Sequence, residues 1–214
     1  MRLTYYAATP AAILLGAVSL HAQFTPVTAK IRITDETIRN GKVIKTKMRE
    51  GNYYRSSDGS FIRQWTKIDG DEKAAPFSPG QLFDNRTATN YQLDFANHRA
   101  YEREKGGEPM VAHPPNYEAA KKLRHDSVQG IPCILNPVKF YHRDTNTYED
   151  IGTNWRSLEY NLNLRLDLTR KLDNGDSVHE ITELFEIHIG TEPDPKLFDL
   201  QKNFTVYRPE AAPH

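Results

Sequence analysis

The sequence predicts a mainly β protein built around a single curved antiparallel sheet or half-barrel, with one or two short helices. Apolar and polar residues alternate with period two in segment after segment, helical periodicity is scarce, and Asn-Gly or Asp-Gly pairs separate several of the alternating runs. Such alternation places apolar side chains on one face of a strand, and these dipeptides favour tight reversals. The hydrophobic fraction of 38% is below that of an average domain and fits a sheet with one wet side.

The clearest alternating unit is a hairpin that joins residues 161–168 to residues 178–189. Its connection contains Asn174-Gly175, which favours a two-residue type I′ turn because both positions need positive φ. A turn at these two residues would place Leu168 opposite Ile181 and Leu164 opposite Phe185. The hairpin is therefore expected to present one apolar face and one wet face.

Two further hairpins are expected at Asn40-Gly41 and Asp58-Gly59. Two-residue turns at these pairs would place Ile33 opposite Met48 and Arg55 opposite Ile62. Other strands are expected at 91–95, 98–103, 124–128, 131–141 and 204–207, a short helix at 116–123 and a single helical turn at 195–200.

Residues 1–22 predict a secretory signal peptide, which leaves residues 23–214 as a single β-rich domain. An apolar stretch follows a basic residue and ends in small residues up to Ala22. The alternative, a membrane anchor, needs about 20 apolar residues; this stretch is shorter and contains Pro10. Cleavage after Ala22 would release a soluble protein into an exported compartment, periplasmic or extracellular.

The chain has 28 basic and 28 acidic residues and therefore no formal net charge. Nucleic-acid-binding surfaces favour a net basic face, because they neutralise phosphates. No nucleic-acid partner is expected, although a balanced total still allows a local basic patch.

Cys133 is the one cysteine, so it cannot form an internal disulfide. Its neighbours in 130–135 are mostly apolar, which predicts a buried thiol that packs as a small hydrophobic group. The alternative, a nucleophile, would need a nearby histidine and an electropositive setting.

No metal site and no cofactor are expected. His179-Glu180 begins like the zinc motif H-E-x-x-H, but the run ends in Glu183 and lies on a predicted strand, where positions 179 and 183 are about 13 Å apart. The sequence also contains no G-x-S-x-G elbow and no glycine-rich phosphate loop. An enzyme is not expected; an unrecognised hydrolase stays open as a third reading, in which Cys133 or a histidine would meet a carboxylate in a cleft.

Aromatic and aliphatic side chains on the strands are the remaining candidates for function. Packing in the core explains them most simply, whereas a curved sheet with an apolar concave face would bind a lipid or another hydrophobic ligand. The irregular stretches 69–80 and 106–115 would then act as gates. The candidates for the apolar lining are Trp65, Leu93, Phe95, Leu162, Leu164, Phe185 and Ile187.

Three motifs together resemble a family of exported bacterial β-rich proteins of uncharacterised function. Residues 54–60, YRSSDGS, resemble its Tyr-Arg-Asp-Ser-x-Gly-Arg hairpin, with Ser56 in place of Asp. Residues 93–101, LDFANHRAY, resemble its Leu-Asp-Pro-x-x-x-x-Ala-Tyr turn, with Phe95 in place of Pro. The most distinctive match is 191–198, TEPDPKLF, which resembles its C-terminal Glu-Pro-Asp-Pro-x-Leu-Phe element.

That family is similar to the lipoprotein-carrier (LolA-like) architecture, a half-barrel with an apolar concave face and a small helical cover. The resemblance implies binding of a hydrophobic ligand or a lipoprotein, and it brings no catalytic residues. The element that contains Pro193, Pro195, Leu197 and Phe198 is expected to be a structural clasp, in which Leu197 and Phe198 close one end of the sheet.

Two functions of different classes follow. In the first, the concave face binds a lipid or a lipoprotein acyl chain. In the second, the protein is a non-catalytic envelope interaction or sensor protein that binds another envelope protein, and the concave side is simply filled core. An open apolar cavity favours the first function, and a cavity filled by side chains favours the second.

Overall fold

The computed structural model describes residues 24–69, 79–105, 108–112 and 116–208. The predicted signal peptide lies outside these residues and stays a prediction. The strands are β1 Val27–Arg39, β2 Lys42–Arg55, β3 Phe61–Ile68, β4 Pro79–Asp84, β5 Thr89–Asp94, β6 Arg99–Lys105, β7 Arg124–Val128, β8 Ile131–His142, β9 Thr147–Ser157, β10 Leu162–Lys171, β11 Ser177–Ile189 and β12 Thr205–Tyr207. The helices are α1 Tyr117–Ala120, the 3-10 helix η1 Pro195–Phe198 and α2 Leu200–Asn203.

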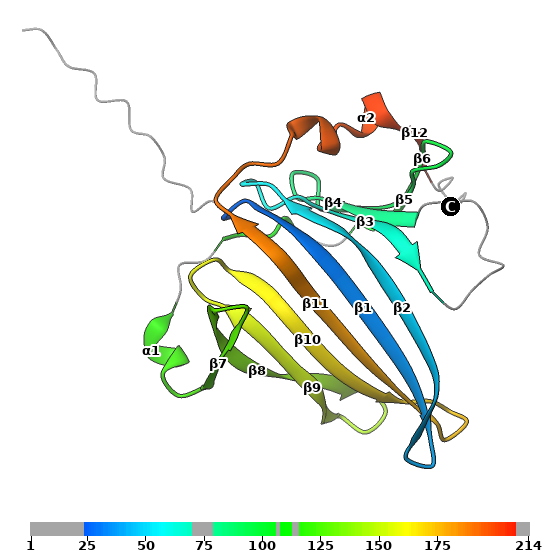
Figure 1. The fold of residues 1–214 in the computed structure, drawn as a ribbon, viewed down its shortest axis with the longest axis vertical. Coiled ribbons are helices and arrows are strands. Elements are labelled where there is room, and N and C mark those ends of the chain that lie inside the picture. Colours follow the sequence, from blue (N-terminus) through cyan, green and yellow to red (C-terminus); the bar gives the residue numbers. More distant parts are fainter. Residues whose placement is uncertain (1–23, 70–78, 106–107, 113–115, 209–214) are drawn as a thin grey trace, which may run out of the picture.

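One sheet takes up all twelve strands, in the order β12-β6-β5-β4-β3-β2-β1-β11-β10-β9-β8-β7. Every neighbouring pair in it is antiparallel except β12 with β6. The predicted mainly β, single curved sheet is therefore confirmed (Figure 1). Among the described residues, no helix is long and apolar enough to span a bilayer.

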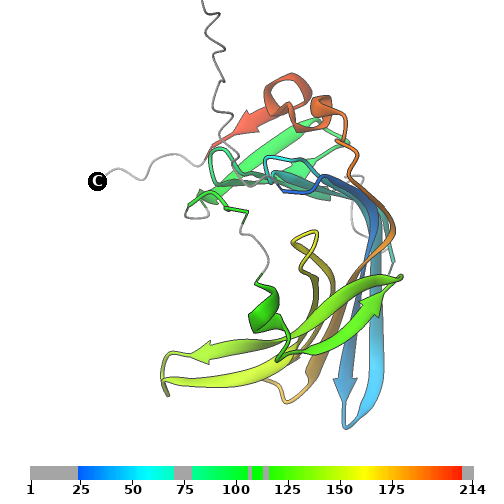
Figure 2. The same ribbon diagram turned by 90° about the vertical axis from the view of Figure 1, so that its left-hand side faces the viewer.

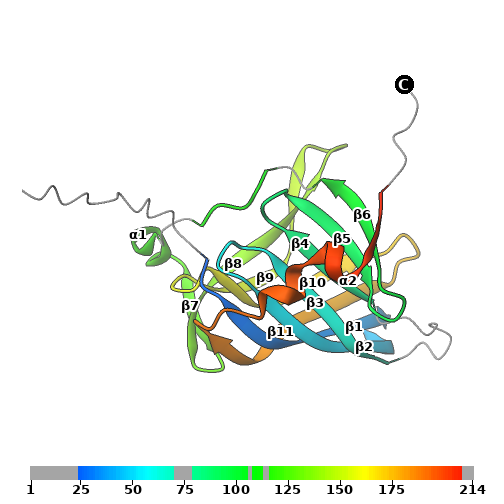
Figure 3. The same ribbon diagram turned by 90° about the horizontal axis from the view of Figure 1, so that it is seen from above.

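The sheet is strongly bent, as the side view shows (Figure 2). Strands β3 to β6 form one arm of the curve, β8 and β9 form the other, and α1 lies on the concave side. The C-terminal segment with η1, α2 and β12 lies across the outside of the first arm (Figure 3). The molecule therefore has a concave face and a separate, covered outer face.

Close cross-strand contacts at two glycines accompany the bend. A Cβ at Gly51 would lie 2.1 Å from the carbonyl oxygen of Gln64, and one at Gly152 would lie 1.9 Å from that of Asp167. The strand pairs β2–β3 and β8–β9 each shift register at or next to these glycines. Bulges with glycine increase the local twist of a sheet, so they help it to curl.

The turn at Asn40-Gly41 is confirmed. Both residues have positive φ, 50° and 73°, as a type I′ turn requires. The expected register holds for the two pairs next to the turn, and a bulge then shifts it by one residue. Ile33 consequently lies opposite Arg49 and not Met48.

The expected registers of the other two hairpins are wrong. In each loop only the glycine has positive φ, 89° at Gly59 and 85° at Gly175, so each turn has three residues with the glycine in the left-handed position. The extra residue moves each register by one. Arg55 thus lies opposite Phe61 and not Ile62, and Leu168 lies opposite Glu180 and not Ile181.

Most expected elements lie close to their predicted positions. Strands β5, β6, β7, β8 and β12, the helix α1 and the turn η1 match the expected segments within a few residues. Two strands were not predicted, β4 and β9. Strand β4 begins at Pro79, where the Pro-rich composition indicates a loop, and β9 contains Gly152, which weakens a strand signal.

Two clusters of buried apolar side chains lie on opposite faces of the sheet. Tyr53 belongs to one and its neighbour Tyr54 packs against the other, since successive residues of a strand point to opposite faces. The first cluster comprises Val27, Ala29, Ile31, Tyr53, Cys133, Leu162, Leu164 and Leu184. The second cluster comprises Ile62, Leu82, Tyr91, Leu93, Ala100 and Phe204, and the C-terminal segment covers it.

A buried arginine connects the ends of three segments. The guanidinium of Arg55 on β2 donates hydrogen bonds to the main-chain carbonyls of Thr25 at 2.8 and 3.1 Å, Tyr160 at 2.8 Å and Asn161 at 2.7 Å. It also lies over the ring of Phe24, 5.7 Å from its centroid. Arg55 therefore links the start of β1 and the β9–β10 turn to the middle of the sheet.

We expect Arg55→Met to lower the free energy of unfolding by about 3 kcal/mol, because it leaves three main-chain carbonyls without their donor. Urea unfolding followed by circular dichroism measures this change. Arg170→Met is the matched control: Arg170 forms an exposed pair with Glu180, so its loss is expected to change stability by at most about 0.5 kcal/mol. Equal urea midpoints for the two variants would contradict a structural role for Arg55.

Candidate functional site

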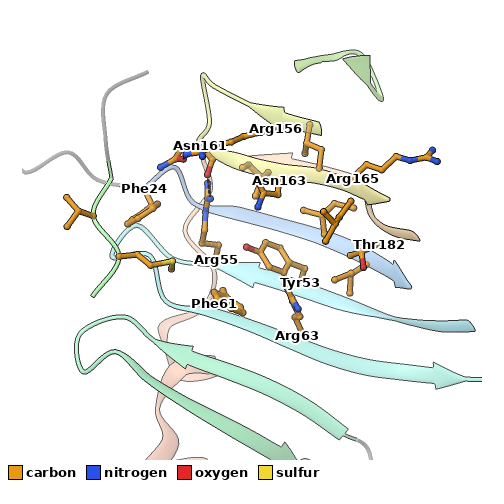
Figure 4. A pocket seen from close by; sticks show the side chains of 17 residues that line it. Phe24, Tyr53, Arg55, Phe61, Arg63, Arg156, Asn161, Asn163, Arg165 and Thr182 are labelled. Atoms are coloured by element: carbon orange, nitrogen blue, oxygen red, sulfur yellow. Dashed lines mark hydrogen bonds between the residues drawn. The ribbon is translucent and has the colours of Figure 1, made fainter. Parts of the chain in front are cut away.

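A cavity of about 480 Å³ lies on the concave face. Strands β1, β2, β3, β10 and β11 line it, together with Phe24 and part of segment 108–112 (Figure 4). Its volume is within the range of about 300–1,000 Å³ that is usual for small-molecule sites. The concave side is consequently not filled by side chains at this point.

The floor and walls of the cavity are mainly apolar. Ile31, Leu164 and Leu184 come from the first cluster, so the same side chains that form the core also face the cavity. Tyr53 and Phe61 add an aromatic wall, with stacked rings whose centroids are 6.1 Å apart. Such a surface favours alkyl or aromatic groups of a ligand over polar ones.

Met110 and Val111 close one side of the cavity from segment 108–112. They are 41% and 65% exposed, an unusual exposure for large apolar side chains. The buried Asn85 holds this segment: its side chain donates to the carbonyl of Met110 at 3.0 Å and accepts from the amide of Met110 at 2.6 Å. The described part of the predicted gate 106–115 therefore lies beside the cavity, whereas most of the predicted gate 69–80 lies outside the described residues.

A second cavity, of about 640 Å³, lies between the Asp58 turn and the C-terminal segment. Four carboxylates line it, those of Asp58, Asp84, Glu192 and Asp199. Desolvating so many charges would oppose the binding of an apolar ligand. The concave cavity is thus the better candidate site.

The charged side chains that line the concave cavity are all arginines, Arg55, Arg63, Arg156 and Arg165, and no described Asp or Glu lines it. Burial lowers the pKa of Arg55 and of Arg63. An arginine stays protonated in proteins even so. The cavity therefore has a mainly apolar lining and an excess of positive charge.

The structure brings four of the seven predicted lining residues to the first cluster. Leu162 and Leu164 are buried in it, and Trp65 and Ile187 pack against it. The guanidinium of Arg49 lies over the ring of Trp65, 5.4 Å from its centroid. Of these four, only Leu162 and Leu164 also line the cavity.

The other three predicted lining residues lie elsewhere. Leu93 is 1% exposed in the second cluster, and Phe95 packs against that cluster, with its ring 5.4 Å from that of Phe204. Phe185 pairs with Lys30 of β1 and lies under the guanidinium of Arg32, on the face opposite Leu184. The predicted β10–β11 register is one residue off, and such a shift exchanges the two faces of a strand. This is why Phe185 lies on the face opposite the one expected.

The C-terminal element predicted as a clasp lies on the second cluster. Pro195 begins η1, which Asp194 caps by accepting a hydrogen bond from the amide of Lys196 at 3.0 Å. Phe198 packs against the second cluster and Pro193 is buried, whereas Leu197 is 37% exposed. The element therefore covers the outer face through Phe198 and not through Leu197.

Sequence reasoning missed Arg55, Arg63, Met110 and Val111. A usable signal existed for Arg63, because period two places it on the same face of β3 as Phe61 and Trp65. No such signal marks Met110 and Val111, which lie in an irregular segment that only the tertiary structure brings to the cavity.

No described histidine lines the cavity. Across the described ranges, no Ser, Thr or Cys side chain forms a hydrogen bond with a histidine. His179 lies between Asp167 at 2.8 Å and Glu36 at 3.5 Å, on the face opposite the cavity-lining Thr182. The described residues also contain no group of three His, Cys, Asp or Glu that could hold a metal ion.

Cys133 is a free thiol that is 3% exposed within the first cluster. Its Sγ donates to the carbonyl of Ile131 at 3.4 Å, and burial raises the pKa of the thiol. A raised pKa is the opposite of what a nucleophile needs.

We expect Ellman's reagent to label Cys133 about a hundredfold more slowly in the folded protein than in urea at the same pH. Exposure of the thiol requires an opening of the first cluster, and an opening that costs about 3 kcal/mol slows labelling by that factor. A Ser127→Cys, Cys133→Ser variant, with its thiol on the exposed position of β7, should label rapidly without urea. Rapid labelling of native Cys133 would contradict its burial.

Comparison with known proteins gives similarities of structure. No protein-family model matches the chain, and no curated protein sequence matches it. Two structures of PNGF-II, in the C2 and P21 space groups, align with 86% of this chain at 10% identity and TM-scores of 0.40 and 0.41. This chain spans only 31% and 32% of those chains.

The descriptions of two further similar structures name the LolA superfamily and lipoprotein sorting. The LolA superfamily protein NE2245 from Nitrosomonas europaea is 9% identical, with a TM-score of 0.34, over 83% of this chain and 90% of that one. A domain from Vibrio parahaemolyticus, described as an outer membrane lipoprotein-sorting protein, is 8% identical, with a TM-score of 0.34 and the same coverage. Structures of the kind that the sequence motifs imply are thus among the similar ones, and a function has to come from this chain's own residues.

Proposed function

We propose that the protein binds one hydrophobic or amphiphilic molecule, such as a lipid or a lipoprotein acyl chain, in the cavity on its concave face. The observation that carries this proposal is an accessible cavity of about 480 Å³ whose walls are the apolar side chains of the first cluster. Each buried CH₂ group of a ligand would contribute about 0.8 kcal/mol. Met110 and Val111 would gain cover from such a ligand, which accounts for their exposure.

The proposed role is non-enzymatic. The one cysteine is buried with a raised pKa, and the cavity lining contains no histidine and no described carboxylate. A hydrolase would need a nucleophile and a base within hydrogen-bond reach of a common substrate position. Binding without reaction fits the side chains that line the cavity.

The ligand proposal predicts that Thr182→Trp weakens ligand binding by about tenfold or more, because the indole would occupy the cavity that Thr182 lines. Displacement of a fluorescent fatty-acid probe measures this affinity, and native mass spectrometry shows whether a lipid co-purifies. Ile181→Trp is the matched control, since Ile181 is the adjacent residue of β11 and points to the other face. It is expected to bind the probe like the unchanged protein.

Absence of probe binding, together with a ligand-free mass for protein purified from its own envelope, would refute the ligand proposal. The rival function, binding of another envelope protein, would then become the better one. A specific observation favours that rival: large apolar side chains are exposed at two hairpin ends, Val43 and Ile44 near the start of β2, and Phe140 and Tyr148 near the end of β8–β9.

The protein is further proposed to be exported as a single domain that begins after residue 22. We expect the mature protein to start at Gln23, because Ala22 ends the predicted signal peptide with a small residue. N-terminal sequencing and intact-mass measurement of the protein from the periplasm or the medium check this. A chain that keeps Met1 and remains in the cytoplasm would contradict export.

A further inference from the structure

The lining of the cavity on the concave face has an excess of positive charge, although Asp167 pairs with one of its arginines, Arg165. Four arginines line it, and no described Asp or Glu does, although the whole chain has equal numbers of acidic and basic residues. The charges therefore balance over the whole chain but not among the residues that line the cavity. A purely apolar ligand would bring no negative group to pair with these arginines.

Three of the four arginines have partners within the protein. Arg55 donates to main-chain carbonyls, and Arg156 donates to the side chain of Asn161. Arg165 pairs with Asp167 at 3.3 Å and lies over the ring of Trp155. Figure 4 shows the Arg165 side chain pointing away from Tyr53 and Phe61 at the centre of the site.

Arg63 is different, because it has no hydrogen bond and no ion pair among the described residues. It is half-buried on β3, and its Nε is buried without a partner. Its closest described partner is the ring of Phe61, 5.3 Å from the guanidinium carbon to the centroid. The terminal nitrogens are not among the buried atoms that lack a partner, so they remain accessible.

The charged groups near Arg63 are already paired with one another. Arg49 and Glu180 both influence its pKa, and so does the hydroxyl of Tyr53. Arg49 pairs with Asp35 at 3.1 Å, and Glu180 pairs with Arg170 at 3.3 Å. Arg63 thus holds a partly desolvated charge without its own counterion, which is costly until an anion arrives.

We propose that Arg63 binds the anionic headgroup of an amphiphile, a carboxylate or a phosphate oxyanion, while the alkyl chain lies against apolar lining residues that are not buried, Leu166 and Met110. This inference rests on the proposed function and names the class of its ligand. A guanidinium can donate two parallel hydrogen bonds to either oxyanion, and such charge-assisted bonds are strong where water is largely excluded. Figure 4 shows Arg63 next to Tyr53 and Phe61, the aromatic wall of the cavity.

The test compares ligands with one alkyl chain and different headgroups. We expect the protein to bind dodecanoate and dodecyl phosphate about ten- to a hundredfold more tightly than dodecanol, measured by displacement of a fluorescent probe. Arg63→Met should remove this preference and leave dodecanol affinity within about twofold. Arg32→Met is the matched control, because Arg32 pairs with Glu50 and Glu183 and does not line the cavity, and it should keep the preference.

Three results would overturn the assignment. The unchanged protein could bind all three ligands equally, which would leave the proposed function intact and remove only the headgroup site. Arg63→Met, folded by circular dichroism, could lose all three ligands to the same extent, which would make Arg63 structural. Inorganic phosphate or acetate could compete as strongly as dodecanoate, which would indicate a site for a small free anion. Failure of every amphiphile to bind would instead refute the proposed function itself.

Discussion

The hydrogen bonds of Arg55 hold together the end of the sheet beside which the cavity lies. Its guanidinium donates to the carbonyls of Thr25, Tyr160 and Asn161, so that it joins the segment before β1 and the β9–β10 turn to β2. No carboxylate takes part, so main-chain carbonyl dipoles alone balance the charge. This constraint keeps the β9–β10 turn close to β2, and the concave cavity lies between them.

The two apolar clusters have different roles, because they are covered to different extents. The second cluster, which includes Leu93, is sealed by the C-terminal segment through Phe198 and Phe204, so that it contributes stability. The first cluster, which includes Leu164, is only partly covered, so that the same burial leaves a cavity. The η1–α2–β12 segment covers the outer face over the second cluster, whereas the concave face keeps its cavity.

The positions of strands were largely predictable and their registers were not. Alternation and Gly-containing turns located β7 and β8 almost to the residue, because both signals are local. The register of a hairpin depends on whether one or two turn residues adopt positive φ, and Asn174-Gly175 is compatible with either. That single choice moved Phe185 to the outer face, whereas Leu162 and Leu164 kept their predicted face.

The sequence by itself determined the fold class, the burial of Cys133, the reversal at Asn40-Gly41 and the neutral total charge, since all of these follow from composition and local pattern. Only the tertiary structure decided which apolar residues face the cavity and which lie beneath the C-terminal segment. It also decided that four arginines from β2, β3, β9 and β10 line one cavity whose lining contains no described carboxylate. Contacts between distant segments depend on the register and the bending of many strands together. No local sequence pattern encodes the combined effect.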